Sequence, residues 1–416
     1  MNPARRAWLG VLAAGALGDT SRAAAPSAPS VAGSAPSAIR RGTVLAFPRD
    51  HGAHVEARTE WWYITGWLAP PAQARTPAPT PTHGFQVTFF RSRLPAADAA
   101  AGSASTTISR FAPRQLLFAH AAVTDLAAAR HHHAQRIARW NGDPGSGPDR
   151  AALADADVRL DRWHLRHERA GDGGGGSSAH SDRAATIASR WLTEVTTDAF
   201  ALRASMLATQ PPLLQGDAGF SRKGPDESQA SLYVSLPQLE TDLTLELSGQ
   251  PRLALQGRAW LDHEWSDHLL HPQAVGWDWI GINLFDGSAL TAFQLRRADG
   301  RALWAGGSLR GFTGVGAQGV PGLSSRSFAA EEVQFDPGRR WRSAATNASY
   351  AIEWKVRTPA GLHTVRALLD AQELAGGGGT GAVYWEGLVE LLDDGGRRVG
   401  LGYLEMTGYA APLKMG

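Results

Sequence analysis

Short runs that alternate apolar and polar residues with a period of two recur along the chain beyond residue 42. This period places the apolar side chains on one face of a β-strand, and the runs end at Gly, Pro or Asp. Patterns with a helical period are scarce. The clearest runs are 60–68, 84–91, 116–124, 191–195, 230–236, 243–247, 277–284, 289–296, 302–309, 326–335, 349–356, 364–371, 382–391 and 398–407. The sequence therefore predicts an all-β protein.

A weak internal repeat divides these strands into two similar halves. Residues 60–68 and 84–91 form a Trp-led strand, a long loop and a second strand, and residues 277–284 and 289–296 repeat the pattern with a short turn. Two such hairpins predict two tandem antiparallel β-barrels, unless the resemblance is a coincidence between Trp-containing hairpins. The segment 130–150, with three consecutive histidines, is expected to be an irregular surface loop.

Composition limits the classes of function. A chain of 416 residues with 43% hydrophobic and 19% charged residues is typical of a two-domain globular protein. Its 41 Lys and Arg nearly balance 39 Asp and Glu, and the arginines are scattered, so no nucleic-acid partner is expected. The chain has no cysteine, which excludes disulfides and thiolate chemistry.

The N-terminus resembles a secretory signal. Arg5 and Arg6 precede an apolar run, and small residues at 23–25 are suited to cleavage, which predicts export to the periplasm or medium, and the paired arginines are typical of the twin-arginine variant. Beyond this segment the sequence has no run of eighteen apolar residues, so no membrane-spanning helix is expected. We expect a leader over residues 1–41, a first barrel over 42–255 and a second over 256–416.

Familiar catalytic templates are missing from the sequence. It contains no nucleophile elbow, phosphate loop or HExxH motif, and the four glycines at 173–176 have the composition of a linker. The adjacent histidines His131, His132 and His133 point in different directions in a strand or loop, which does not suit a metal site. We therefore expect no metal and no cofactor.

The stretch 257–286 is the strongest candidate for a functional site, because it holds four of the fifteen tryptophans among acids and histidines. Strand alternation puts His263 and Trp265 on one face, with Asp262 and Glu264 on the other. Asp278 likewise lies opposite the tryptophans that flank it. This mixture predicts a partly apolar cavity that holds a few polar groups.

Such a cavity suits acid catalysis on an apolar ligand. Burial raises the pKa of a carboxyl group, so that it can donate a proton near neutral pH, and tryptophan faces stabilise a cation. Together these properties would suit protonation of a carbon–carbon double bond. The alternative is that the polar residues are buried, hydrogen-bonded groups in a barrel wall.

Several motifs together resemble the AttH and carotenoid 1,2-hydratase (hydroxyneurosporene synthase, CrtC-type) family. They are TEWWYITGWL (59–68), GFQVTFFR (84–91), AHAAVTD (119–125), WLDHEWS (260–266), GWDWIGINL (276–284), YWEGLVE (384–390) and GYLEMTGY (402–409), and the resemblance covers residues 42–412. It implies two tandem lipocalin-like β-barrels. It also implies that a hydratase of this family adds water to an acyclic carotenoid without a redox cofactor.

The resemblance also implies roles for particular residues. Asp278 would protonate the alkene, Trp265 would stabilise the tertiary cation and His263 would activate water, although Gly276 stands where the hydratase pattern has a tyrosine. The residues expected to contact an elongated hydrophobic ligand are Trp277, Trp279, Trp62, Trp260 and Tyr233. The alternative function is a non-catalytic lipid carrier or an export accessory that associates with a membrane surface or transporter. A third possibility is a secreted hydrolase, but the sequence contains no recognisable nucleophile for one.

Overall fold

The computed structural model describes residues 39–94, 114–145, 147–169, 189–268, 270–315, 321–375 and 383–413, all within one compact unit. The expected signal peptide and the glycines at 173–176 lie outside these residues. Within them the regular secondary structure is almost entirely strand, with one short α-helix, α1 (Pro71–Ala74), and the 3-10 turns η1 (Arg49–His51) and η2 (Ala330–Glu332). No described helix is long and apolar enough to cross a membrane.

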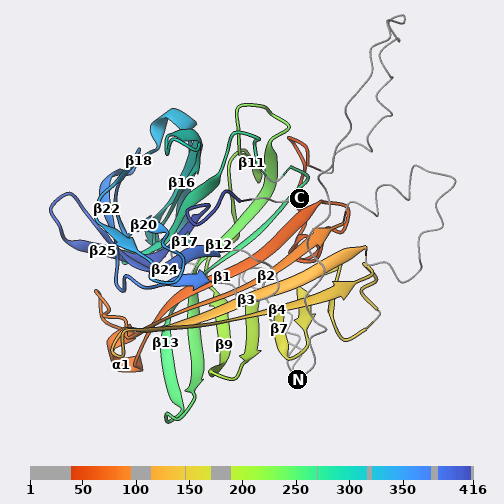
Figure 1. Ribbon diagram of the computed structural model, residues 1–416, viewed down its shortest axis with the longest axis horizontal. Helices are drawn as coiled ribbons and strands as arrows, with labels where there is room; N and C mark the ends of the chain where they lie inside the picture. Colours follow the sequence, from red (N-terminus) through yellow and green to blue (C-terminus); the bar gives the residue numbers. More distant parts are fainter. Residues whose placement is uncertain are drawn as a thin grey trace, which may run out of the picture. The chain divides into compact units, whose positions relative to one another are not determined.

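The first half is one antiparallel sheet of 13 strands, which runs from red-orange to green in Figure 1. Its strands are β1 (Thr59–Ala69), β2 (His83–Arg93), β3 (Gln115–Asp125), β4 (Arg130–Trp140), β5 (Arg150–Ala151), β6 (Asp157–Leu160), β7 (Trp163–Arg169), β8 (Ser189–Thr196), β9 (Phe200–Ala208), β10 (Leu213–Leu214), β11 (Phe220–Arg222), β12 (Ala230–Leu247) and β13 (Leu253–Ser266). Their order is β4-β3-β2-β1-β13-β12-β9-β8-β7-β6-β5, and β10 and β11 pair with β12. The earliest long strand is therefore hydrogen-bonded to the last one.

The second half is an antiparallel sheet of 10 strands, drawn in teal and blue in Figure 1, with a small hairpin beside it. Its strands are β14 (Gly276–Leu284), β15 (Ala289–Arg296), β16 (Ala302–Val315), β17 (Pro321–Phe328), β18 (Gln334–Pro337), β21 (Glu353–Thr358), β22 (Gly361–Ala367), β23 (Glu373–Ala375), β24 (Val383–Leu392) and β25 (Arg398–Thr407), and the hairpin is β19 (Arg340–Arg342) and β20 (Ser349–Ala351). The order is β17-β16-β15-β14-β25-β24-β22-β21-β18, with β23 paired to β24.

This architecture confirms the predicted all-β fold of two tandem lipocalin-like antiparallel barrels, since each sheet curls into a barrel-like half. The expected boundary between residues 255 and 256 falls inside β13, all of whose pairings lie within the first sheet. The chain passes to the second sheet between Ser266 and Gly276.

Some local predictions were wrong. Residues 130–140, expected in a surface loop, form the edge strand β4, whose Arg- and His-rich composition suits a strand that is only partly buried. The predicted strand 326–335 is interrupted by η2, and 349–356 is divided between β20 and β21. Strand β9 was missed altogether, although its buried residues alternate with partly exposed ones.

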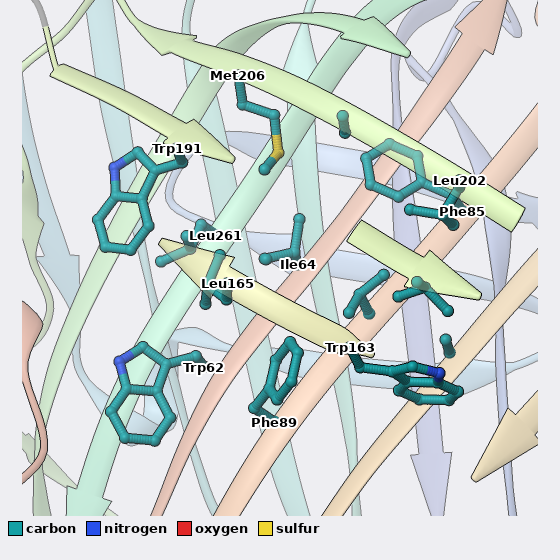
Figure 2. Packing of buried hydrophobic residues seen from close by; sticks show 14 of the residues in the cluster. Trp62, Ile64, Phe85, Phe89, Trp163, Leu165, Trp191, Leu202, Met206 and Leu261 are labelled. Carbon is teal, nitrogen blue, oxygen red and sulfur yellow. The ribbon is translucent and has the colours of Figure 1, made fainter. Parts of the chain in front are cut away.

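The core of the first half fills one face of its sheet. Trp62 and Ile64 on β1 are fully buried there with Phe85 and Phe89 on β2, and Figure 2 shows them beside Trp163, Trp191 and Met206. Because successive residues of a strand point to opposite faces, Trp61 and Tyr63 lie on the other face. That other face carries the candidate site.

A bulge in β12 joins the two sheets. The register of β12 against β13 shifts between Leu236 and Leu239, and Gln238 has a positive φ of 58°. The Gln238 backbone N–H donates to Asn283 on β14, and its side-chain amide donates to the carbonyls of Leu284 and Ser288. The bulge therefore fixes the second sheet against the first.

Candidate active site

A cavity of about 110 Å³ is enclosed by side chains from both sheets. The first sheet and the segments beside it contribute Trp61, Tyr63, Thr88, Phe90, Lys223, Ser231, Tyr233, Asp262, Glu264, Ser266, His268 and Leu270. The second sheet contributes Trp277, Trp279, Phe293, Leu295, Glu386 and Glu405. The lining therefore combines aromatic rings with four carboxyl groups, which is the partly apolar environment that the sequence predicted.

Asp262 is the central polar group of the first wall. It lies opposite Tyr63 in the β1–β13 ladder and is 3% exposed. Its carboxylate accepts hydrogen bonds from the Tyr233 hydroxyl at 2.7 Å, the Ser235 hydroxyl at 2.5 Å and the Trp260 indole at 2.7 Å. Burial raises the pKa of Asp262 to about 7 although these three donors oppose the rise. The group can therefore exchange a proton near neutral pH.

Glu386 and Glu405 face each other on the second wall, because they pair directly between β24 and β25. Burial and the neighbouring Glu405 charge raise the pKa of Glu386 well above its usual range. Burial also raises the pKa of Glu405 to about 7, although a hydrogen bond from Trp277 opposes the rise. Two carboxyl groups this close in an apolar setting do not both ionise, so the pair retains a proton at neutral pH.

Tyr63 on the first wall and Glu386 on the second wall are hydrogen-bond partners of each other. Neither the Tyr63 hydroxyl oxygen nor Oε1 of Glu386 has a further partner of ordinary geometry among the described residues. Glu386 is 1% exposed and Tyr63 is 6% exposed, so bulk water does not satisfy them. A hydroxyl and a carboxyl group can each form more than one hydrogen bond, so both side chains have spare capacity for a ligand in the cavity.

Lys223 supplies a positive charge next to the cavity. Its ammonium group lies 2.9 Å from Glu264 and sits over the rings of Tyr233 at 4.6 Å and Phe293 at 4.4 Å. These contacts neutralise Glu264 and leave the other three carboxyl groups without a lysine or arginine in contact within the described lining.

A close approach of β14 to β13 positions the aromatic wall. The rings of Trp260 and Trp279 meet edge to face, and the Trp279 indole donates to the Tyr233 hydroxyl at 3.0 Å. A Cβ on Gly281 would lie 2.3 Å from the Trp279 ring and 3.2 Å from the Trp260 ring. Only glycine therefore fits under these two rings.

The three residues predicted to be catalytic lie away from the cavity. His263 and Trp265 point to the opposite face of β13, where His263 stacks on Trp62. Asp278 points to the inner face of the second sheet and bonds Gln294, Arg296 and Tyr409 at 2.8 to 2.9 Å. Burial raises the pKa of Asp278, and the Arg296 charge opposes this rise. The structure does not bring these three side chains together.

The residues predicted to bind ligand divide into two groups. Trp277, Trp279 and Tyr233 line the cavity. Trp260 lies behind the wall as a donor to Asp262, and Trp62 is buried in the first core, as Figure 2 shows. The prediction separated the two faces of each strand but assigned residues from both faces to one site, and only those on the cavity face line the cavity.

Sequence reasoning missed Glu386 and Glu405. Each is an acid inside an otherwise apolar strand, within the motifs YWEGLVE and GYLEMTGY, and that contrast was the available signal. Nothing in the sequence connects Lys223 to the Trp-rich stretch. Among the described residues, the one set of histidines and acids close enough to share a metal ion is His54, Glu60 and His263.

The fold and cavity together define a lipocalin-like protein with two barrels and an acidic, aromatic site between its sheets. A family model described as AttH-like matches residues 38–409, and the chain belongs to this family.

Solved structures agree with this assignment. An AttH candidate from Nitrosomonas europaea is 40% identical, with a TM-score of 0.71 over 89% of this chain and 99% of that one. Kievitone hydratase from Nectria haematococca shares the fold at 14% identity, with a TM-score of 0.58 over 88% of this chain and 94% of that one. No curated protein matches the sequence.

Proposed function

We propose that the protein binds an elongated apolar ligand, such as an isoprenoid or carotenoid, and adds water across one of its carbon–carbon double bonds. The observation that carries this proposal is the pair of proton-exchanging carboxyl centres in the cavity: Asp262 on the first wall, and Glu386 with Glu405 on the second. A hydration needs a proton donor and a proton acceptor near one double bond, and no redox cofactor.

In the proposed mechanism the Glu386–Glu405 pair donates its shared proton to one alkene carbon. The π electrons form the new C–H bond, and the other carbon becomes a cation that the rings of Trp277 and Trp279 stabilise. Water attacks this carbon and gives its proton to the Asp262 carboxylate, so the product is the alcohol. Proton transfer from Asp262 back to the pair, through solvent, restores the starting state.

The size of the cavity limits how much of the ligand it encloses. A cavity of about 150 Å³ admits benzene, so the cavity of about 110 Å³ suits a branched end of about five carbons. Trp61, Leu270 and Trp277 are partly exposed and form its mouth, where the rest of a long chain would extend. We therefore propose that the reacting double bond is a terminal one.

The proposal is tested by incubating purified protein with acyclic carotenoids and shorter isoprenoids and measuring the hydrated product by mass spectrometry. Glu405→Gln and Asp262→Asn are each expected to lower kcat by about 10²- to 10⁴-fold, the usual contribution of a general acid or base. Asp242→Asn changes an exposed carboxylate on β12 and is the matched control. Equal background conversion by wild type and Glu405→Gln would contradict the proposal.

The same assay compares the cavity residues with the set that the family resemblance implies. If Asp278 is the proton donor, Asp278→Asn abolishes hydration and Glu405→Gln does not. If the cavity carries the chemistry, Glu405→Gln has the large effect, and Asp278→Asn retains activity in proportion to its folded fraction. Circular dichroism of each variant provides that fraction.

A carrier function is the second candidate, because the aromatic lining suits apolar ligands whether or not they react. It predicts saturable quenching of tryptophan fluorescence by long-chain ligands, with the same affinity in Glu405→Gln and no product. Absence of quenching with every chain length would contradict both candidates. Export, and association with a membrane surface or a transporter, remain part of this proposal and would be tested by fractionating cells that express the full chain.

A further inference from the structure

We propose that His54, Glu60 and His263 form a binding site for one divalent transition-metal ion of the kind that imidazole prefers, such as zinc. The site lies on the core face of β1 and β13, opposite the face that lines the cavity. His54 precedes β1, Glu60 lies on β1 and His263 on β13, and their exposed fractions are 8%, 0% and 0%. This inference is independent of the proposed hydration.

The three ligand atoms converge on one point. Oε1 of Glu60 lies 2.8 Å from Nδ1 of His54 and 2.9 Å from Nε2 of His263, and all three atoms are within 4.8 Å of one another. Two imidazole nitrogens and one carboxylate oxygen are a common protein ligand set for zinc and similar ions. The convergence combines residues from distant parts of the sequence.

The opposite nitrogens of both imidazoles are held as they are in metal sites. Nε2 of His54 lies 3.1 Å from the Asp50 carboxylate, and Nδ1 of His263 lies 3.1 Å from the Asp50 carbonyl oxygen. Metal-binding histidines usually donate their second N–H to such groups, which orients the ring and fixes its tautomer. On both rings this leaves the nitrogen that faces Glu60 as the one free to bind an ion.

The hydrogen bonds make this arrangement unusual for neutral histidines. Both nitrogens of both rings face acceptors, whereas a neutral imidazole has a single N–H to donate. Satisfying every contact with protons requires two imidazolium ions whose ring centres are 5.5 Å apart. One divalent cation in place of the two protons facing Glu60 satisfies the same atoms with the same total charge.

The surrounding residues would stabilise either a metal ion or two protonated histidines at this position. Arg91 donates to Oε2 of Glu60 at 2.7 Å, and the backbone N–H of His54 donates to the same oxygen at 3.0 Å, so both groups fix the carboxylate. His54 stacks on Trp265 with ring centres 3.6 Å apart, and His263 stacks on Trp62 at 4.7 Å. Aromatic faces favour imidazolium as well, so a pair of protonated histidines is the outcome that competes with a metal ion.

A metal ion here would be structural. It would connect the segment that contains Asp50 and His54 to β1 and β13, while Trp62 and Trp265 keep bulk water from it. Because side chains on the two faces of a strand point apart, it would not contact a ligand in the cavity. A metal-binding measurement without substrate therefore tests this inference, whatever the hydration assay shows.

The test uses the full chain without a histidine tag, dialysed against a chelator and titrated with Co²⁺. We expect saturable binding of one ion per chain, with the visible absorption of nitrogen-coordinated Co²⁺, and displacement of Co²⁺ by Zn²⁺. His54→Gln and His263→Gln should each weaken binding at least about 100-fold, and Asp50→Asn about 10-fold. His164→Gln, at a histidine 2.7 Å from Asp157 on another strand, should leave binding unchanged.

Two results would overturn the inference. One is the absence of saturable Co²⁺ or Zn²⁺ binding to the wild-type protein, which would indicate two protonated histidines, and this result needs no variant to fold. The other is undiminished binding in both His54→Gln and His263→Gln. A loss of binding in His132→Gln instead would assign the ion to the histidines of β4.

Discussion

The two faces of the wall formed by β1 and β13 are built from alternating residues of the same strands, yet they differ in chemistry. On the core face, Glu60 pairs with Arg91 and two histidines, and every charge there has a close partner. On the cavity face, Lys223 pairs with Glu264, but Asp262 is held only by neutral donors, and Glu386 across the cavity is bonded to the neutral hydroxyl of Tyr63. Removing one member of a buried ion pair is costly, whereas carboxyl groups held by neutral donors can exchange a proton with a ligand.

Breaking the core-face pair should have the largest effect. Arg91 and Glu60 have fully buried side chains with 2.7 Å between Nε and Oε2, so Arg91→Met leaves a buried carboxylate without its main counter-charge. We expect the free energy of unfolding to fall by about 3–5 kcal/mol, measured by urea denaturation. The exposed pair of Arg203 and Glu194 is the control, and Arg203→Met should cost about 1 kcal/mol or less. Equal losses in the free energy of unfolding would show that the buried pair is no more important to stability than the exposed pair.

The neighbouring tryptophans Trp61 and Trp62 test the comparison at adjacent positions. Trp62 is 0% exposed and donates to the His51 carbonyl, so Trp62→Phe should lower the free energy of unfolding by about 2–3 kcal/mol. Trp61 lines the mouth of the cavity, so Trp61→Phe should cost under about 1 kcal/mol and alter fluorescence quenching by apolar ligands instead. The reverse result would place the binding surface on the core face.

The cavity face should also determine how stability depends on pH. Asp262 and Glu405 keep their protons to about pH 7 in the folded state, whereas the unfolded chain releases them near pH 4. Between these values the folded state binds more protons, so the free energy of unfolding falls as pH rises, by up to about 1.4 kcal/mol per pH unit for each group.

Denaturation curves between pH 4.5 and 7 would measure this decline. Asp262→Asn removes one contribution to this decline and should make it shallower, while Asp242→Asn should leave it unchanged. An identical slope in wild type and Asp262→Asn would show that Asp262 is ionised across the whole range.

The smallest expected effect concerns one hydroxyl group. Ser235→Ala removes the 2.5 Å hydrogen bond to Asp262 and should raise the pKa of that carboxyl group by about one unit. Carboxyl ¹³C chemical shifts followed through a pH titration would measure the change. Ser231→Ala, at a cavity residue with no bond to Asp262, is the control. No change in Ser235→Ala would mean that Tyr233 and Trp260 hold the carboxylate by themselves.

The sequence predicted the strands and the two faces of each strand better than it predicted the site. A period of two is a local property, so it correctly separated Asp262 from His263 and Asp278 from the tryptophans beside it. Which face meets the cavity depends on how the second sheet packs against the first. That packing depends on contacts such as those of the β12 bulge, which no local pattern reveals.

The sequence also failed to reveal the residues that long-range strand pairing brings to the two sites. Glu386 and Glu405 come more than 100 residues after Asp262, and only the pairing of β24 with β25 brings them together. His54 lies in an irregular segment without periodicity, and its partner His263 is brought to it by the pairing of β1 with β13. The family resemblance correctly predicted the fold. A sequence motif can suggest the role of a residue, but it does not show in which direction the side chain points.

The pairing of β1 with β13 has a consequence for the order of folding. Thr59 lies opposite Ser266, so the first sheet cannot close until the ribosome has synthesised the chain beyond residue 266. Until then β1 has a free edge, and bringing together strands so far apart in sequence is entropically costly and slow. We therefore expect nascent chains that stop before β13 to require chaperones, and longer ones that include it to resist proteolysis.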